Sequence, residues 1–169
     1  MPSVLYEPVM NALFAHLQML VPVPFAYASR RLMTWQAVVN NTNQGSSPIR
    51  QPALFLYDGF GLGGGRLVTD QRGRGNPSVR ILHRTIVVYA QLPGTGTPLG
   101  PDAVTPGGTV FAPLQEAIEV AFIPDRDGTL TLGGLVSHCW IEGEGIWSPP
   151  DIDPNGQGMF TVPVRIMIP

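Results

Sequence analysis

The sequence predicts an α+β fold: an antiparallel or mixed β-sheet flanked by two helices, in the order α-β-β-β-α-β-β. Three observations support it. Two segments carry apolar residues at helical spacing, five are rich in branched and aromatic side chains, and strands follow one another through hairpin-length connections. The 169 residues are expected to form one domain, residues 1–169, because the chain is too short for two ordinary cores.

The first predicted element is a helix over residues 3–21. Ser3 can cap its start, and Pro22 and Pro24 end it because proline lacks the amide donor and clashes with the preceding turn. Its apolar residues lie at helical spacing, which predicts one buried face. They are Met10, Leu13, Phe14, Leu17, Leu20 and Val21.

The next predicted elements are strands over residues 30–39, 52–58 and 78–92, where branched and aromatic side chains concentrate. A polar loop over residues 40–47 separates the first two. The run Ile86, Val87, Val88 and Tyr89 makes the third strand the clearest of the set.

A second helix is predicted over residues 110–122, with Pro113 in its first turn and Pro124 closing it. After a turn at Asp127 and Gly128, two more strands are predicted over residues 129–142 and 159–168. Most of the 20 glycines and 18 prolines fall in three long loops, which we expect to order against partners. These Gly/Pro-rich loops are residues 59–77, 93–108 and 148–158.

The composition excludes several classes of protein. Charged residues are 13% of the chain, about half the usual share, which indicates a surface that partners cover. A net charge of −2 gives no footprint of a protein that grips nucleic acid. The absence of lysine excludes P-loop ATPases, Schiff-base enzymes and pyridoxal enzymes. The single Cys139 and an N-terminal segment unlike a signal peptide or membrane span indicate a cytoplasmic protein.

Three short motifs have chemical interpretations that the surrounding sequence disfavours. Residues 59–64 satisfy GxGxxG after a strand, but a polar glycine-rich loop follows where a nucleotide site needs a helix. Asp151, Asp153 and Asn155 match half of a calcium loop, yet Val162 stands where the bidentate Glu belongs. A calcium-dependent binding module stays a remote alternative.

The pair His138 and Cys139 suggests a cysteine hydrolase, but neighbours in a strand point to opposite faces of the sheet. The other two histidines, His16 and His83, do not lie at a sequence spacing from His138 that is typical of metal ligands. We therefore predict no catalytic, cofactor-binding or metal-binding residues, and a protein that is not an enzyme.

The charges are distributed in two blocks. Residues 66–84 hold half of the arginines against Asp70 alone, whereas residues 116–153 hold eight carboxylates against Arg126 alone. The alternative to a functional pattern is an ordinary solvated surface. The functional interpretation is a head-to-tail contact between subunits, since heterologous contacts that close generate rings. The predicted interface residues are Arg66, Arg72, Arg74 and Arg80, with Glu142 and Glu144 as their partners.

The order of elements resembles the tail terminator (tail completion) family of long-tailed bacteriophages. Residues 135–145 (LVSHCWIEGEG) and 157–169 (QGMFTVPVRIMIP) are similar to the final hairpin of such proteins. The resemblance covers most of the chain as topology and about the last third as sequence, and the three long loops depart from a minimal terminator.

The resemblance implies a virion protein of the tail or neck region, assembled in the host cytoplasm as a hexameric homo-oligomeric ring. Such a ring caps the tail tube, stops its polymerisation and provides the surface for head-tail joining. Its implied partners are the tail tube protein and a head-tail connector or neck protein, while DNA passes through the lumen without specific binding. The alternative in the same class is another neck, tail tube or minor tail structural protein.

Overall fold

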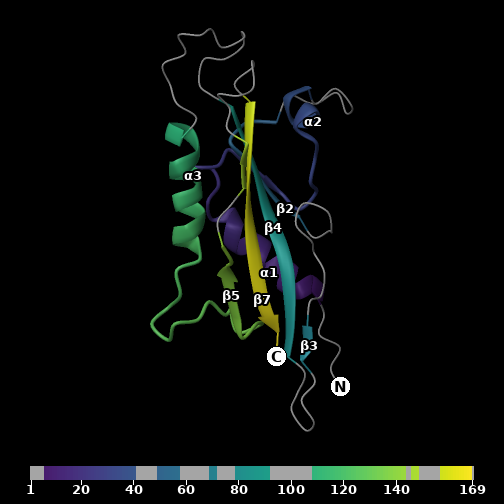
Figure 1. Cartoon of the computed structure of the whole chain (residues 1–169), viewed down its shortest axis with the longest axis vertical. Helices are drawn as coiled ribbons and strands as arrows, with labels where there is room; N and C mark the ends of the chain where they lie inside the picture. The colour runs from purple at the N-terminus through teal and green to yellow at the C-terminus, as the bar shows by residue number, and fades with distance from the viewer. Residues whose placement is uncertain are drawn as a thin grey trace.

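Two long antiparallel strands, β4 (Val79–Gln91) and β7 (Gln157–Ile168), form the centre of the fold (Figure 1). They pair along their whole lengths, from Arg80 opposite Ile168 to Gln91 opposite Gln157. The structure is a computed structural model. It describes residues 6–40, 49–57, 69–71, 79–91, 108–143, 146–148 and 157–168.

The other strands extend this pair into a mixed sheet. On one side β2 (Ala53–Tyr57) pairs antiparallel with β4, and β1 (Tyr27–Ser29) pairs in parallel with β2. On the other side β5 (His138–Ile141) pairs antiparallel with β7. Two short strands, β3 (Thr69–Gln71) and β6 (Ile146–Ser148), pair with β4 and β7, which gives seven strands within the described ranges.

Helices α1 (Tyr6–Gln18) and α3 (Gly108–Ala121) pack on one face of the sheet and enclose the main core. Alternate residues of β7, such as Val162 and Ile166, point into this core because strand side chains alternate between faces. The Phe111 ring of α3 meets Phe160 of β7 edge to face, with centroids 5.3 Å apart. At the helix ends, His16 Nε2 donates to the Ala121 carbonyl at 2.6 Å, which joins α1 to α3.

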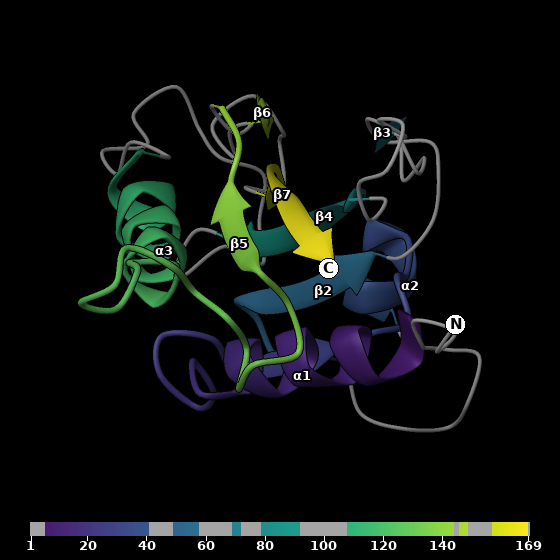
Figure 2. The same ribbon diagram turned by 90° about the horizontal axis from the view of Figure 1, so that it is seen from below.

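Helix α2 (Trp35–Asn40) lies on the opposite face of the sheet, so the two views place α2 and α3 at opposite sides of the molecule (Figures 1 and 2). Its Val38 is buried in a second cluster with Phe55 of β2 and Tyr89 of β4. The Tyr89 hydroxyl donates to the Met33 carbonyl at 2.9 Å and holds the segment before α2 against the sheet. The sheet therefore separates two apolar layers.

The predicted α+β class and the mixed sheet are confirmed. The predicted strands over residues 52–58, 78–92 and 159–168 correspond to β2, β4 and β7, and the helix over 110–122 corresponds to α3. The first helix ends earlier than predicted, at Gln18, and turns follow it up to Pro24. The predicted order is incomplete: the described elements run α1-β1-α2-β2-β3-β4-α3-β5-β6-β7.

Two predicted strands are wrong in part. Within residues 30–39 the chain forms α2, because Thr34 caps a helix there: its Oγ1 accepts from the Ala37 N–H at 3.3 Å. Within residues 129–142 only His138–Ile141 is a strand. Leu132, Gly133 and Gly134 all have positive φ and turn the chain before β5 begins.

Candidate assembly surfaces

The structure describes two of the six predicted interface residues. Arg80 lies in β4, paired in register with Asp70 of β3 on one side and Ile168 of β7 on the other. Glu142 directly follows β5. The remaining four, Arg66, Arg72, Arg74 and Glu144, lie outside the described residues.

Glu142 forms an ion pair within its own chain. Its N–H donates to the Pro163 carbonyl at 3.0 Å, which extends the pairing of β5 with β7 by one residue. Its Oε2 accepts from Nε of Arg165. The Glu142 side chain is 45% exposed, and an exposed pair of this kind contributes about 0–1 kcal/mol. Glu142 therefore has a partner before any neighbouring subunit arrives.

Arg165 occupies the centre of a cross-strand row, opposite His83 of β4 and Trp140 of β5. Its Nη1 donates to Nε2 of His83. Burial and then the charges of Arg165 and Arg84 lower the pKa of His83, so the neutral ring that accepts this bond is favoured. The guanidinium is thus held by a carboxylate on one side and an imidazole on the other.

His138 and Cys139 point to opposite faces of β5, as the sequence predicts. Cys139 is buried in the main core, and burial raises the pKa of its thiol to about 12. His138 Nδ1 accepts from the Leu130 N–H at 3.1 Å, and its ring stacks on Trp140 with centroids 5.1 Å apart. The thiol is protonated at neutral pH and the imidazole holds a turn, so the pair lacks the geometry of an activated nucleophile.

The calcium-like turn at Asp151, Asp153 and Asn155 and the GxGxxG motif at 59–64 lie outside the described residues. The turn after α3 is described: Asp125 Oδ1 accepts from the Asp127 N–H at 3.1 Å, and Gly128 has φ +74°. This is an Asx turn that the carboxylate itself closes. Across the described ranges, no three His, Cys, Asp or Glu side chains gather as a metal ion would require.

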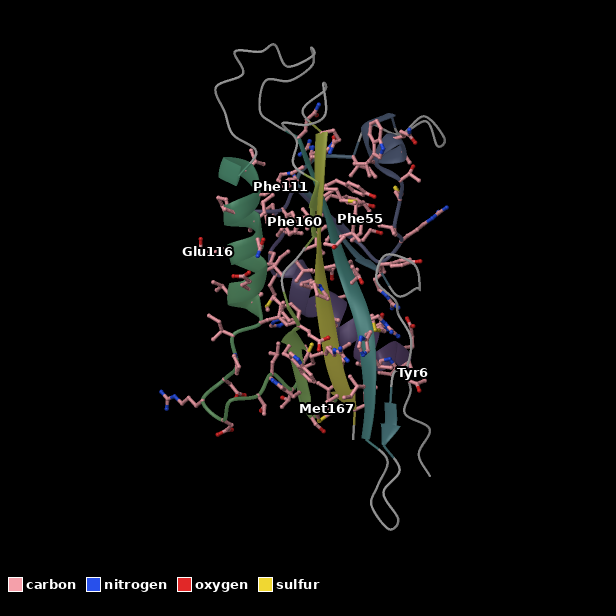
Figure 3. All side chains as sticks on the ribbon, in the orientation of Figure 1. Tyr6, Phe55, Phe111, Glu116, Phe160 and Met167 are labelled. Carbon is pink, nitrogen blue, oxygen red and sulfur yellow. The ribbon has the colours of Figure 1, made fainter. Side chains whose placement is uncertain are left out.

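The outer side of α3 and the segment after it combine carboxylates with exposed apolar side chains. Phe111 and Ile118 face the core, whereas Glu116 points away from the sheet (Figure 3). Val120 and Ile123 are 57% and 63% exposed. We call this the acidic surface, which consists of Glu116, Glu119, Val120, Ile123, Asp125 and Asp127.

The opposite side of the molecule carries a basic surface around α2, defined by the exposed residues Arg31, Trp35 and Arg50. Between Glu7 and Asp58 the sequence has no Asp or Glu. The neighbouring Arg30 pairs with Glu7 of α1 at 2.5 Å, so Arg31 and Arg50 carry the net positive charge of this surface. Trp35, the first residue of α2, is 39% exposed.

Sequence reasoning did not select Arg165, Trp35, Val120 or Ile123. Alternation in the last strand could have identified Arg165, because Val164 and Ile166 on either side of it face the core. Helical spacing could have identified Val120, which falls off the stripe formed by Leu114 and Ile118. No such signal distinguishes Trp35, since its segment was predicted as a strand.

No protein-family profile matches this chain, and neither does any curated protein sequence. In the part of the chain that the structure describes, no helix has the length and apolar character needed to cross a membrane.

Proposed function

We propose that this chain is a structural subunit of a bacteriophage virion, a tail terminator that forms a ring on the finished tail tube. The observation that carries the proposal is the antiparallel pairing of β5 with β7. These strands lie within the two stretches, residues 135–145 and 157–169, that resemble the final hairpin of that family. The N-terminal helix α1, the central sheet and the helix α3 before the closing strands agree with the arrangement that the resemblance implies.

The exposed apolar residues of the acidic surface support an assembly function. Val120 lies in the last turn of α3, and Ile123 follows the helix, where its N–H donates to the Val120 carbonyl at 3.2 Å. Neither side chain belongs to the main core. Exposed apolar groups with a charged surround are typical of surfaces that bind another protein. The low share of charged residues, 13%, agrees with a surface that is partly covered in the assembled particle.

The mechanism is steric. One face of the ring is complementary to the last ring of tube protein and the other to the head-tail connector or neck protein. Occupation of the tube end blocks the site where the next tube ring would add, and no covalent bond is made or broken. DNA passes through the lumen without specific contacts, which agrees with a net charge of −2.

The test is a tube-growth assay with the cognate tail tube protein. Tubes polymerise in the presence of increasing amounts of this protein, and their lengths are measured in negative-stain images. A terminator stops growth once every end is capped, and rings are seen at the ends. Continued growth with no ring at any end would refute the proposal, and incorporation along the tube wall would show a tube protein instead.

A further inference from the structure

We propose that the ring contact joins the acidic surface of one subunit to the basic surface of the next copy of the chain. In this contact Trp35 packs against Val120 and Ile123, while Arg31 and Arg50 pair with Glu116 and Glu119. The inference rests on the proposed ring and names the two surfaces that build it.

The positions of the two surfaces determine the type of contact. α2 and α3 lie on opposite sides of the sheet in both views (Figures 1 and 2). A two-fold dimer brings the same surface of both subunits together. Two complementary surfaces on opposite sides of one subunit therefore cannot both be paired in such a dimer. They join subunits head to tail, and such a contact forms a ring wherever its rotation closes.

The charges favour the same arrangement. The acidic surface holds four exposed carboxylates, Glu116, Glu119, Asp125 and Asp127, with Arg126 as the one cation between them. The basic surface comes from a segment, residues 8–57, whose charged residues are arginines alone. Contact between two copies of the same surface places like charges together, whereas contact between the two different surfaces pairs opposite charges.

The apolar residues provide the centre of this contact. Trp35 is 39% exposed, and Val120 and Ile123 are 57% and 63% exposed. Each surface thus combines exposed apolar side chains with charged ones, as protein interfaces do. Trp and Arg are also the residues that contribute most often to binding energy at such centres.

The contact differs from the one predicted from sequence. Glu142, one predicted acidic partner, already binds Arg165 in its own chain. Glu116 and Glu119 are exposed on α3, and Glu119 Oε1 accepts from Nε2 of the neutral Gln115 at 2.7 Å, so no cation of the same helix neutralises it. The acidic partner is therefore assigned to α3.

The experiment uses two double variants of the full chain and measures mass in solution by light scattering. Arg31→Glu with Arg50→Glu makes both surfaces acidic, and Glu116→Arg with Glu119→Arg makes both basic. Each variant alone is expected to fail to form the ring. An equimolar mixture of the two is expected to restore a ring of alternating subunits, because every contact then joins an acidic to a basic surface.

The matched control is Ala15→Glu with Ser137→Glu, which adds charge at exposed positions of α1 and of the turn before β5. It is expected to form the wild-type ring, and circular dichroism of each variant checks folding. Rings from either double variant alone, or no ring from the folded mixture, would overturn this contact and leave the proposed function standing. Failure of the wild type to form rings in solution or on tubes would overturn both.

Discussion

Arg165 is the one charged residue of β7, and its surroundings follow from strand geometry. Its neighbours Val164 and Ile166 face the core, so its own side chain lies on the other face of the sheet. There the register brings His83 of β4 alongside it, and Glu142 reaches it from the end of β5. A cation, a carboxylate and a neutral imidazole thus stabilise one another across three strands.

His83 makes the stability of this row depend on pH. Burial and the positive charges of Arg165 and Arg84 lower its pKa below the ordinary value of 6.5. Because the folded pKa is below the unfolded one, the unfolded chain binds the proton more readily as the pH falls. The contribution of His83 to the free energy of unfolding is complete above pH 6.5. It is lost progressively as the pH falls from 6.5 toward the pKa of His83 in the folded protein.

We therefore predict that His83→Gln, which keeps an acceptor for Arg165 but does not titrate, loses less stability than the wild type between pH 7.5 and pH 5. Urea unfolding of both proteins at several pH values measures the free energy of unfolding. The other histidines and the carboxylates titrate in both proteins and cancel in the difference. A difference that stays constant over this range would show that His83 does not sense pH in the folded state.

Helix α3 has one side that is buried in the core and one side that is exposed. Its inner side is buried, with Phe111 fully enclosed against Phe160. Its outer side leaves Val120 57% exposed. One side stabilises the fold, and the other is the surface that we propose contacts the next subunit.

Alanine substitutions on the two sides of α3 are expected to separate these functions. Phe111→Ala should cost about 3–5 kcal/mol because it removes a buried ring and leaves a cavity. Val120→Ala should change the stability of the subunit by less than about 0.5 kcal/mol but weaken ring formation. Urea unfolding and light scattering measure the two effects. A Val120→Ala protein that is fully stable and assembles like the wild type would place the contact elsewhere.

The elements that were predicted well are long and periodic. β4, β7 and α3 have enough residues for apolar spacing to identify them, and Pro124 marks the end of α3. α2 was missed because its six residues, WQAVVN, are short and contain two valines, so the Thr34 cap was the one available signal. The strand predicted from residue 129 starts later because Leu132 adopts a left-handed backbone conformation, which a leucine in the sequence does not predict.

The site was less predictable than the fold. Glu142 was selected because it is charged, but its partner Arg165 lies 23 residues away and becomes its neighbour through strand pairing alone. The basic surface at Trp35 and the acidic surface on α3 depend on which faces of two helices remain exposed after the sheet forms. The distribution of charges along the sequence cannot predict these exposed faces, because it does not indicate on which side of the sheet each segment packs.

The arginine-rich span of residues 66–84 is a second proposed contact, separate from the ring contact between the acidic and basic surfaces. Reversing Arg72→Glu and Arg74→Glu together is expected to weaken head-tail joining while rings still form, because the span loses positive charge that an acidic partner would bind. Arg72→Lys with Arg74→Lys keeps the charge and serves as the control. If the reversed protein joins tails as the wild type does, charge pairing by residues 72 and 74 is excluded.

The proposed function requires that this subunit assemble into a closed ring. The most direct measurement is the mass of the purified protein by light scattering, together with negative-stain images of the same sample, alone and after mixing with tail tubes. We predict closed rings of about six subunits, the closed head-to-tail assembly that the proposed family implies. Open-ended stacks, or a monomer that forms no ring even on tube ends, would rule out a closed terminator ring.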